Sequence, residues 1–265
     1  MATPTGPSAR TIVFVHGMFM TPLCWEHWIP YFQAKGYACL APAWPGRDQP
    51  IETLRANHPD PQLGRLTLSR VVQHVGSTIR NLSEKPILIG HSMGGLVVQL
   101  LLQQELGAAG VAIDSAPPMG VFTPQWSFIR SNWPAINPFA PRGRPVRMSF
   151  EHFQYAFVNS VPPADQRAAY DRYVVPESRR VPLESLTGAA RIDFSKPHAP
   201  LLLIAGSADH IIPAALNRSN FRRYGRSASQ TDFKEFAGRD HFGIGERNWE
   251  ELANYTGAWL NEKEV

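Results

Sequence analysis

One short stretch, together with two residues far downstream of it, carries the side chains best suited to covalent chemistry. Residues 90–94 read G-H-S-M-G and fit the pattern G-x-S-x-G, and Asp209 and His241 follow later in the chain. A serine hydroxyl is a weak nucleophile until a base takes its proton, and that base is usually a histidine oriented by a carboxylate. By itself the serine pattern arises by chance in about one of ten chains of this length. The elements around these residues therefore decide what it means.

The elements expected around Ser92, Asp209 and His241 bring these residues to one edge of a sheet. An apolar run at 86–90 predicts a buried strand and the run at 94–107 a helix, which places Ser92 in a sharp strand-to-helix turn. Asp209 and His241 each follow a further predicted strand. Those two strands cover residues 199–206 and 231–238. Carboxyl ends of parallel strands meet at one edge, where open sheets bind ligands. The chain order Ser, Asp, His is also the one typical of such a sheet.

Strands and helices alternate over most of the chain. β-Branched and apolar runs predict three more strands, and apolar residues at helical spacing predict helices between them. The additional strands cover 10–17, 37–42 and 110–117, and the helices cover 21–36 and 66–82, with a last one carrying Trp249, Leu252 and Trp259. Pro30 lies inside the first of these helices and is expected to kink or split it. This alternation predicts an α/β fold with a mostly parallel sheet of about six strands and helices on both faces.

Residues 117–196 break this alternation. The segment is rich in proline and in large apolar side chains, and it is too long for an ordinary connection and too apolar for a disordered one. Short helices are expected within it at 149–159 and 163–174. We therefore predict an inserted helical cap at 117–196 over a core formed by residues 1–116 and 197–265.

Composition narrows the function classes further. The hydrophobic share of 43%, the charged share of 18% and the net charge of +4 suit a globular enzyme that acts on a small molecule. Basic residues are scattered, so nucleic-acid binding is not expected, and no apolar run is long enough to span a membrane. Residues 1–10 lack the apolar core of a secretory signal, and Cys24 and Cys39 do not form a disulfide framework, which together predict a cytoplasmic protein. No metal-ligand spacing and no nucleotide-binding glycine loop occurs, so neither a metal nor a cofactor is expected.

Taken together, the motifs resemble those of the α/β-hydrolase fold superfamily, in its compact form with a cap, as in serine esterases. The resemblance covers nearly the whole chain apart from the cap. It rests on five stretches of sequence, VFVHG at 13–17, LAPAWPG at 40–46, GHSMGG at 90–95, GSADHIIP at 206–213 and GRDHF at 238–242. It implies Ser92 as nucleophile, His241 as base and Asp209 as its orienting carboxylate. It further implies an oxyanion hole formed by the backbone N–H groups of Met18 and Met93, and it implies that the two leading antiparallel strands of longer members are missing.

The function that this resemblance implies is hydrolysis of a carboxylic ester of a small, fairly hydrophobic substrate through an acyl-enzyme. Four residues are expected to line the substrate pocket, Phe19, His91, Met119 and Trp126, and a role in bracing the turn that carries Ser92 is the alternative for His91. Amide, lactone and carbon–carbon bond hydrolases and perhydrolases use the same three catalytic residues and remain alternatives. A hydroxynitrile lyase-like enzyme is disfavoured because neither loop carrying Asp209 or His241 contains a lysine. A ligand receptor that has given up turnover is the alternative from outside the enzymes.

Several neighbouring residues have competing interpretations. Asp114 also follows a predicted strand, and it is the alternative to Asp209 as the catalytic acid. Asp240 and His210 adjoin the proposed base and acid and are expected to shape their loops. His16 is expected to brace the loop after the first strand through hydrogen bonds of its side chain.

Overall fold

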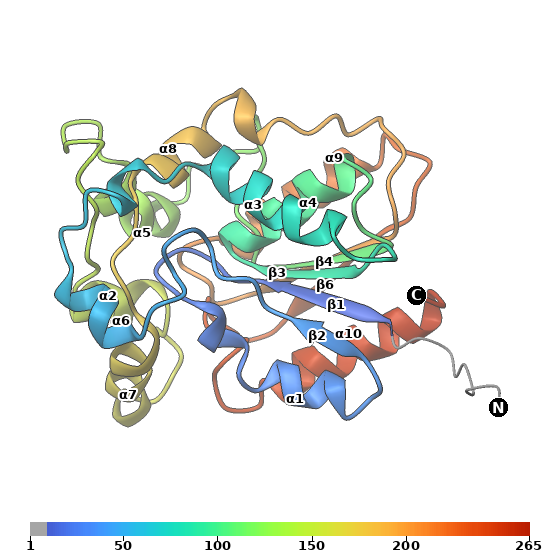
Figure 1. Cartoon of the computed structure of the whole chain (residues 1–265), viewed down its shortest axis with the longest axis horizontal. Helices are drawn as coiled ribbons and strands as arrows, with labels where there is room; N and C mark the ends of the chain where they lie inside the picture. The colour runs from blue at the N-terminus through green and yellow to red at the C-terminus, as the bar shows by residue number, and fades with distance from the viewer. Residues whose placement is uncertain (1–9) are drawn as a thin grey trace.

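A six-stranded sheet runs through the middle of the molecule, whose computed structural model describes residues 10–265 (Figure 1). All neighbouring strands are parallel, in the order β2-β1-β3-β4-β5-β6. The strands are β1 (Thr11–Val15), β2 (Ala38–Leu40), β3 (Ile87–His91), β4 (Ala109–Ile113), β5 (Leu201–Gly206) and β6 (Thr231–Phe236). This confirms the α/β class, the strand number and the parallel arrangement that the sequence predicts.

Helices cover both faces of the sheet. In Figure 1 the helices α3 (Leu68–Arg80), α4 (Met93–Gln103) and α9 (Ala214–Tyr224) lie above it, and α1 (Trp28–Gln33) and α10 (Glu250–Glu262) lie below it. The central strands β1, β3, β4 and β5 are consequently buried along almost their whole length. Burial on both faces explains why they read as continuous apolar runs rather than as an alternation of apolar and polar residues.

The helix predicted at 21–36 is split, as expected, but not at Pro30. It consists of a 3₁₀ turn, η1 (Pro22–Trp25), followed by α1 (Trp28–Gln33). Pro30 lies in the first turn of α1, where a backbone N–H has no partner within the helix, so its ring is tolerated there. Two short elements between β2 and α3, α2 (Ile51–Ala56) and η2 (Leu63–Arg65), were not predicted.

The segment between β4 and β5 consists of short helices joined by irregular stretches. It contains α5 (Trp126–Ile136), α6 (Phe150–Ala156), α7 (Pro163–Tyr173), α8 (Arg180–Ser185) and the 3₁₀ turn η3 (Gly188–Ala190). The helices α6 and α7 match the two short helices expected from the sequence, whereas α5 and α8 were not predicted. In Figure 1 the helices α5 to α8 gather toward the left, beyond the carboxyl end of β1. The division into a core and a cap at 117–196 stays a prediction.

The structure bears on the expected absence of a membrane-spanning segment, but not on the expected absence of a secretory signal. Between residues 10 and 265, no helix is both long enough and apolar enough to cross a membrane. The expectation that residues 1–10 are not a secretory signal falls almost entirely on residues 1–9, which lie outside the described part of the chain.

Candidate active site

Ser92 occupies the turn between β3 and α4 in a backbone conformation that residues other than glycine rarely adopt. Its φ is +57° and its ψ is −122°. Such a conformation costs on the order of 1–3 kcal/mol and persists only where neighbouring bonds hold it. Here the Ser92 N–H donates to the carbonyl of Ile113 at 2.9 Å, and the Ser92 carbonyl accepts from the N–H of Ala116 at 2.9 Å. The end of β4 therefore holds the turn from both sides.

The glycines on either side of Ser92 are required because backbones approach closely at this turn. A Cβ on Gly90 would lie 2.3 Å from the carbonyl oxygen of Gly94, and one on Gly94 would lie 2.1 Å from the carbonyl oxygen of Val15. Both distances are far below van der Waals contact, and the groups met are backbone atoms that cannot move aside. Only glycine fits at either position, which explains the G-x-S-x-G spacing.

Asp209 and His241 are joined by a short hydrogen bond between buried side chains. Nδ1 of His241 lies 2.6 Å from Oδ2 of Asp209, and both side chains are inaccessible to solvent. The other carboxylate oxygen of Asp209, Oδ1, accepts the N–H groups of Ile211 at 2.7 Å and Ile212 at 2.9 Å. Because a carboxylate only accepts, Nδ1 of His241 carries the proton and Nε2 keeps its lone pair. This is the tautomer in which a histidine can act as a base.

The ring of His241 is packed on two sides. His91 lies at a centroid distance of 4.7 Å and Phe157 at 4.9 Å, the latter in an edge-to-face arrangement. Within residues 10–265 the buried Nε2 of His241 has no hydrogen-bond partner, so no hydrogen bond joins it to the Ser92 hydroxyl. Bonds between nucleophile and base are often long without substrate and tighten when substrate binds.

His91 does not line the pocket, although its position next to Ser92 suggested that it would. Its side chain is fully buried, and its Nε2 lies 2.7 Å from the backbone carbonyl oxygen of His241. A carbonyl only accepts, so Nε2 of His91 carries the proton. Burial lowers the pKa of His91 well below 6.5, and the nearby His241 lowers it further. His91 is thus a neutral residue that fixes the backbone of His241.

Asp114, the alternative acid, is close to His241 but not bonded to it. One oxygen of Asp114 and one ring nitrogen each of His91 and His241 lie within 4.8 Å of one another. Oδ1 of Asp114 instead accepts the N–H of Gly206 at 2.7 Å. Burial raises the pKa of Asp114 well above 3.8, and the nearby Asp209 raises it further. A carboxyl that keeps its proton is a poor orienting group for histidine and, for the same reason, a poor metal ligand.

The structure agrees with the bracing roles expected of the other polar neighbours. His16 is fully buried, shares a hydrogen bond between its Nδ1 and the carbonyl of Gly17 at 2.8 Å, and stacks on Trp44 at 4.5 Å. Burial lowers the pKa of His16 to about 3, so it stays neutral. Asp240 accepts the N–H of Ser160 at 2.9 Å, and Nδ1 of His210 lies 2.8 Å from the carbonyl oxygen of Tyr155. Neither Asp240 nor His210 is bonded to the pair formed by Asp209 and His241.

The N–H groups expected to form an oxyanion hole are free of protein acceptors. In the described chain, neither the backbone N–H of Met18 nor that of Met93 donates to another protein group. Met93 is the first residue of α4, where the helix dipole favours negative charge. Met18, Ser92 and Met93 line the same pocket.

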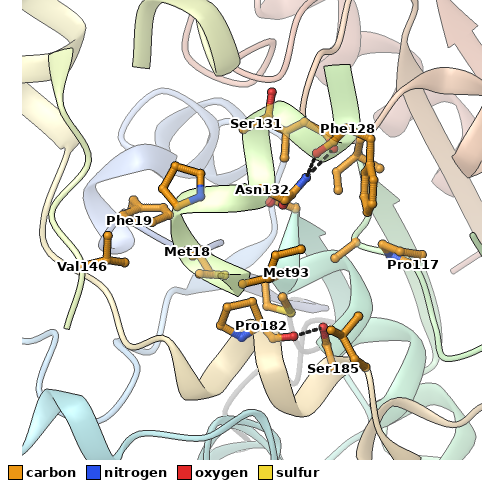
Figure 2. Close-up of a pocket in the computed structure, with 18 of the residues that line it drawn as sticks. Met18, Phe19, Met93, Pro117, Phe128, Ser131, Asn132, Val146, Pro182 and Ser185 are labelled. Carbon is orange, nitrogen blue, oxygen red and sulfur yellow. Dashed lines mark hydrogen bonds between the residues drawn. The ribbon is translucent and has the colours of Figure 1, made fainter. Parts of the chain in front are cut away.

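That pocket has a volume of about 580 Å³ and is mostly apolar (Figure 2). Met18 and Met93 lie at its centre in Figure 2, with Asn132 on one side and Pro182 on the other. The segment between β4 and β5 supplies most of the wall, including Met119, Val121, Phe128, Ala135, Met148 and Phe157. Phe19 and Met119 belong to its lining, whereas Trp126, which begins α5 with 70% of its surface exposed, does not. No motif in the sequence assigns the other wall residues to a pocket, since most of them come from the segment that breaks the alternation of strands and helices.

Comparison with known proteins places the chain in a family. No curated protein matches its sequence, but the model of the alpha/beta hydrolase family matches residues 12–255. Three solved structures superpose at a TM-score of 0.66 each. Polyneuridine aldehyde esterase is 15% identical over 94% of this chain and 99% of its own. A pyrethroid hydrolase from Sphingobium faniae JZ-2 is 19% identical over 96% of this chain and 98% of its own. The monoacylglycerol lipase of Paleococcus ferrophilus is 22% identical over 96% and 94%.

These structures are too distant in sequence to indicate more than a common fold. The family model, by contrast, spans all six strands and all three candidate catalytic residues. The chain belongs to the alpha/beta hydrolase family.

Proposed function

We propose that this enzyme cleaves a carboxylic ester of a hydrophobic small molecule through an acyl-enzyme. Ser92 is the nucleophile, His241 the base and Asp209 the carboxylate that orients it. The observation that carries the proposal is the 2.6 Å hydrogen bond between His241 and Asp209, which sets the tautomer of a base at the same sheet edge as Ser92. Ser92 itself is held at φ +57° on the wall of an apolar pocket.

In the first half of the reaction His241 Nε2 takes the proton of the Ser92 hydroxyl while its oxygen attacks the ester carbonyl carbon. Asp209 stabilises the charge that His241 then carries. The N–H groups of Met18 and Met93 bind the oxyanion, and each such donor contributes roughly 3–4 kcal/mol in a comparable site. His241 gives its proton to the leaving alcohol, and in the second half it activates the water that releases the acid.

The pocket supports an apolar substrate. Its volume of about 580 Å³ lies within the range of ~300–1,000 Å³ that is common for drug-sized ligands. Its wall comes mainly from the segment 117–196, which we propose acts as a cap that selects the substrate. The names of polyneuridine aldehyde esterase and monoacylglycerol lipase favour an ester over an amide or a lactone. We retain a cytoplasmic location in the proposal, in keeping with the free thiols of Cys24 and Cys39.

A fluorophosphonate probe tests the nucleophile. We expect it to label the folded wild type at one residue, and Ser92→Ala to abolish the labelling while leaving the circular dichroism spectrum unchanged. The proposal fails if the folded wild type is not labelled. A panel of p-nitrophenyl esters of graded chain length, run beside matched amides and lactones, tests the bond. We expect the highest kcat/KM for an apolar ester, and a higher value for an amide or a lactone would overturn the ester assignment.

A further inference from the structure

A buried ion pair connects the segment between β4 and β5 to the loop that follows β2. Nη2 of Arg47 lies 2.7 Å from Oε2 of Glu177, and neither side chain is accessible to solvent. Arg47 follows β2, whereas Glu177 lies between α7 and α8. Charged side chains are rarely buried this completely, because removing them from water is costly. A buried ion pair often contributes little to stability, so its role is better explained by the backbone groups that it contacts.

The ion pair holds the backbone of Phe19. The same Oε2 of Glu177 accepts the N–H of Phe19 at 3.2 Å, and the carbonyl of Phe19 accepts the N–H of Val175 at 2.8 Å. Both backbone polar groups of Phe19 are therefore bonded to the segment between α7 and α8. Phe19 has a φ of +63°, a left-handed conformation that costs an ordinary residue roughly 1–2 kcal/mol. The two hydrogen bonds explain why this conformation persists.

Glu177 is in turn fixed by its own neighbours. Its Oε1 accepts the N–H of Ser178 at 2.6 Å, and its backbone N–H and C=O each pair with Val146 at 2.7 Å. The Arg47 guanidinium makes an ionic contact without an aligned hydrogen bond, and its remaining N–H groups find no acceptor in residues 10–265. Arg47 thus contributes charge to the pair rather than directed bonds. The position of the carboxylate is set by the backbone around it.

This arrangement determines which N–H groups of the loop face the pocket. The Phe19 N–H is directed at Glu177, whereas the N–H of Met18, one residue earlier, has no protein acceptor and belongs to a pocket-lining residue beside Ser92. We propose that Glu177, with Arg47 as its counter-ion, is a positioning residue that aims the Met18 N–H at the oxyanion by holding Phe19. This rests on the proposed function, because it assigns to Met18 the oxyanion contact of an acyl-transfer reaction.

Through Glu177 the position of the proposed cap would also affect the catalytic step. Glu177 belongs to the segment that lines most of the pocket, and Met18 belongs to the loop after β1. A displacement of the segment around Glu177 would rotate the Phe19 peptide and with it the Met18 N–H. The position of the cap would then set the rate of the chemical step as well as the fit of the substrate.

Two variants test the proposal. Glu177→Gln keeps the shape of the side chain but removes the charge opposite Arg47. The double variant Arg47→Met with Glu177→Met removes both charges and the acceptor of the Phe19 N–H, and replacing both members of a buried pair by apolar groups often restores stability. For the double variant we expect kcat on a p-nitrophenyl ester to fall about tenfold or more, toward the 10²–10³-fold loss seen when an oxyanion donor is removed, with KM within about twofold of wild type. We expect a smaller loss for Glu177→Gln, because its amide oxygen can still accept the Phe19 N–H. We expect the double variant to match the wild-type Tm without regaining kcat.

An inhibitor that mimics the transition state separates positioning from a general loss of structure. The Ki of an alkyl trifluoromethyl ketone, which forms an oxyanion on Ser92, is expected to rise by the same factor as kcat falls. The concentration of active sites is measured by titration to completion with the fluorophosphonate, so that unfolded protein is not counted when kcat is calculated. Tyr224→Phe is the matched control: it removes a buried hydroxyl bonded to Gln99 at 3.0 Å and is expected to leave kcat unchanged.

The outcomes distinguish this inference from the proposed function. If the wild type is neither labelled nor able to cleave esters, the proposed function fails. If the wild type is active and the double variant keeps kcat within twofold, Glu177 does not position the oxyanion hole. Recovery of both Tm and kcat in the double variant would show that the pair is only structural, and it would overturn the inference as well.

Discussion

Replacing Asp209 and Asp114 separately by asparagine distinguishes the two candidates for the catalytic acid. In Asp209→Asn the side-chain oxygen is expected to stay where Oδ1 is now, because that atom accepts the N–H groups of Ile211 and Ile212. The new amide NH₂ then faces Nδ1 of His241 at the present 2.6 Å. Two donors cannot share a hydrogen bond, so the proton of His241 moves to Nε2. The lone pair that should take the Ser92 proton is lost.

The expected loss follows from this change of tautomer. In serine proteases the same replacement lowers kcat about 10⁴-fold while the geometry stays intact, which corresponds to about 5 kcal/mol of transition-state stabilisation. Asp114→Asn should behave differently. Burial raises the pKa of Asp114 well above 3.8, which favours its protonated form, and an amide has nearly the shape of the protonated acid, including an oxygen for the Gly206 N–H. We expect kcat within about twofold of wild type, a change below ~0.5 kcal/mol.

Steady-state kinetics on one p-nitrophenyl ester, per titrated active site, measures both variants. The reasoning is refuted if Asp209→Asn keeps a tenth or more of the wild-type kcat. It is equally refuted if Asp114→Asn loses a hundredfold, since Asp114 would then be the acid despite its bond to Gly206.

Two further predictions concern Gly17, which lies close to Ser92, and the buried carboxyl group of Asp114. Gly17→Ala places a Cβ 2.8 Å from the Cβ of Ser92 and should lower kcat at least tenfold, whereas Gly188→Ala, whose Cβ meets nothing within 4 Å, should not. Because burial raises the pKa of Asp114, the folded protein holds a proton that the unfolded chain releases above 3.8, and this group lowers stability as pH rises from 3.8 toward its folded pKa. Because asparagine cannot ionise, the Tm of Asp114→Asn should exceed that of wild type at pH 8 but not at pH 4. Equal differences at both pH values would contradict a raised pKa.

The sheet could be predicted because its signals are local. Strands buried on both faces read as β-branched runs, and Gly90 is required by a backbone contact with Gly94 in the same turn, although Gly94 is required by its contact with Val15 of β1. The order of Ser92, Asp209 and His241 adds the expectation that they share an edge. The family match supports the fold that these patterns imply.

The pocket could not be predicted in the same way. The helices α5 and α8 contain Pro134 and Pro182, which reduce the helical signal in the sequence. Trp126 was expected in the pocket, but α5 buries Ser131 and Ala135 instead and leaves Trp126 exposed. His91 was assigned to it as the neighbour of Ser92, although the turn directs the two side chains into different surroundings.

The pairing of Arg47 with Glu177 could not be predicted from the sequence, for a different reason. Charged residues in irregular segments are expected at the surface. Arg47 and Glu177 are 130 residues apart in the sequence, and nothing there indicates that they form a fully buried pair. Only the fold brings the loop after β2, the loop after β1 and the segment after α7 together. If Glu177 positions the oxyanion hole, substitutions that reshape the cap to accept another substrate would also move Phe19. Changes in specificity would then carry a cost in kcat unless the contacts of Glu177 with Phe19 and Val146 are kept.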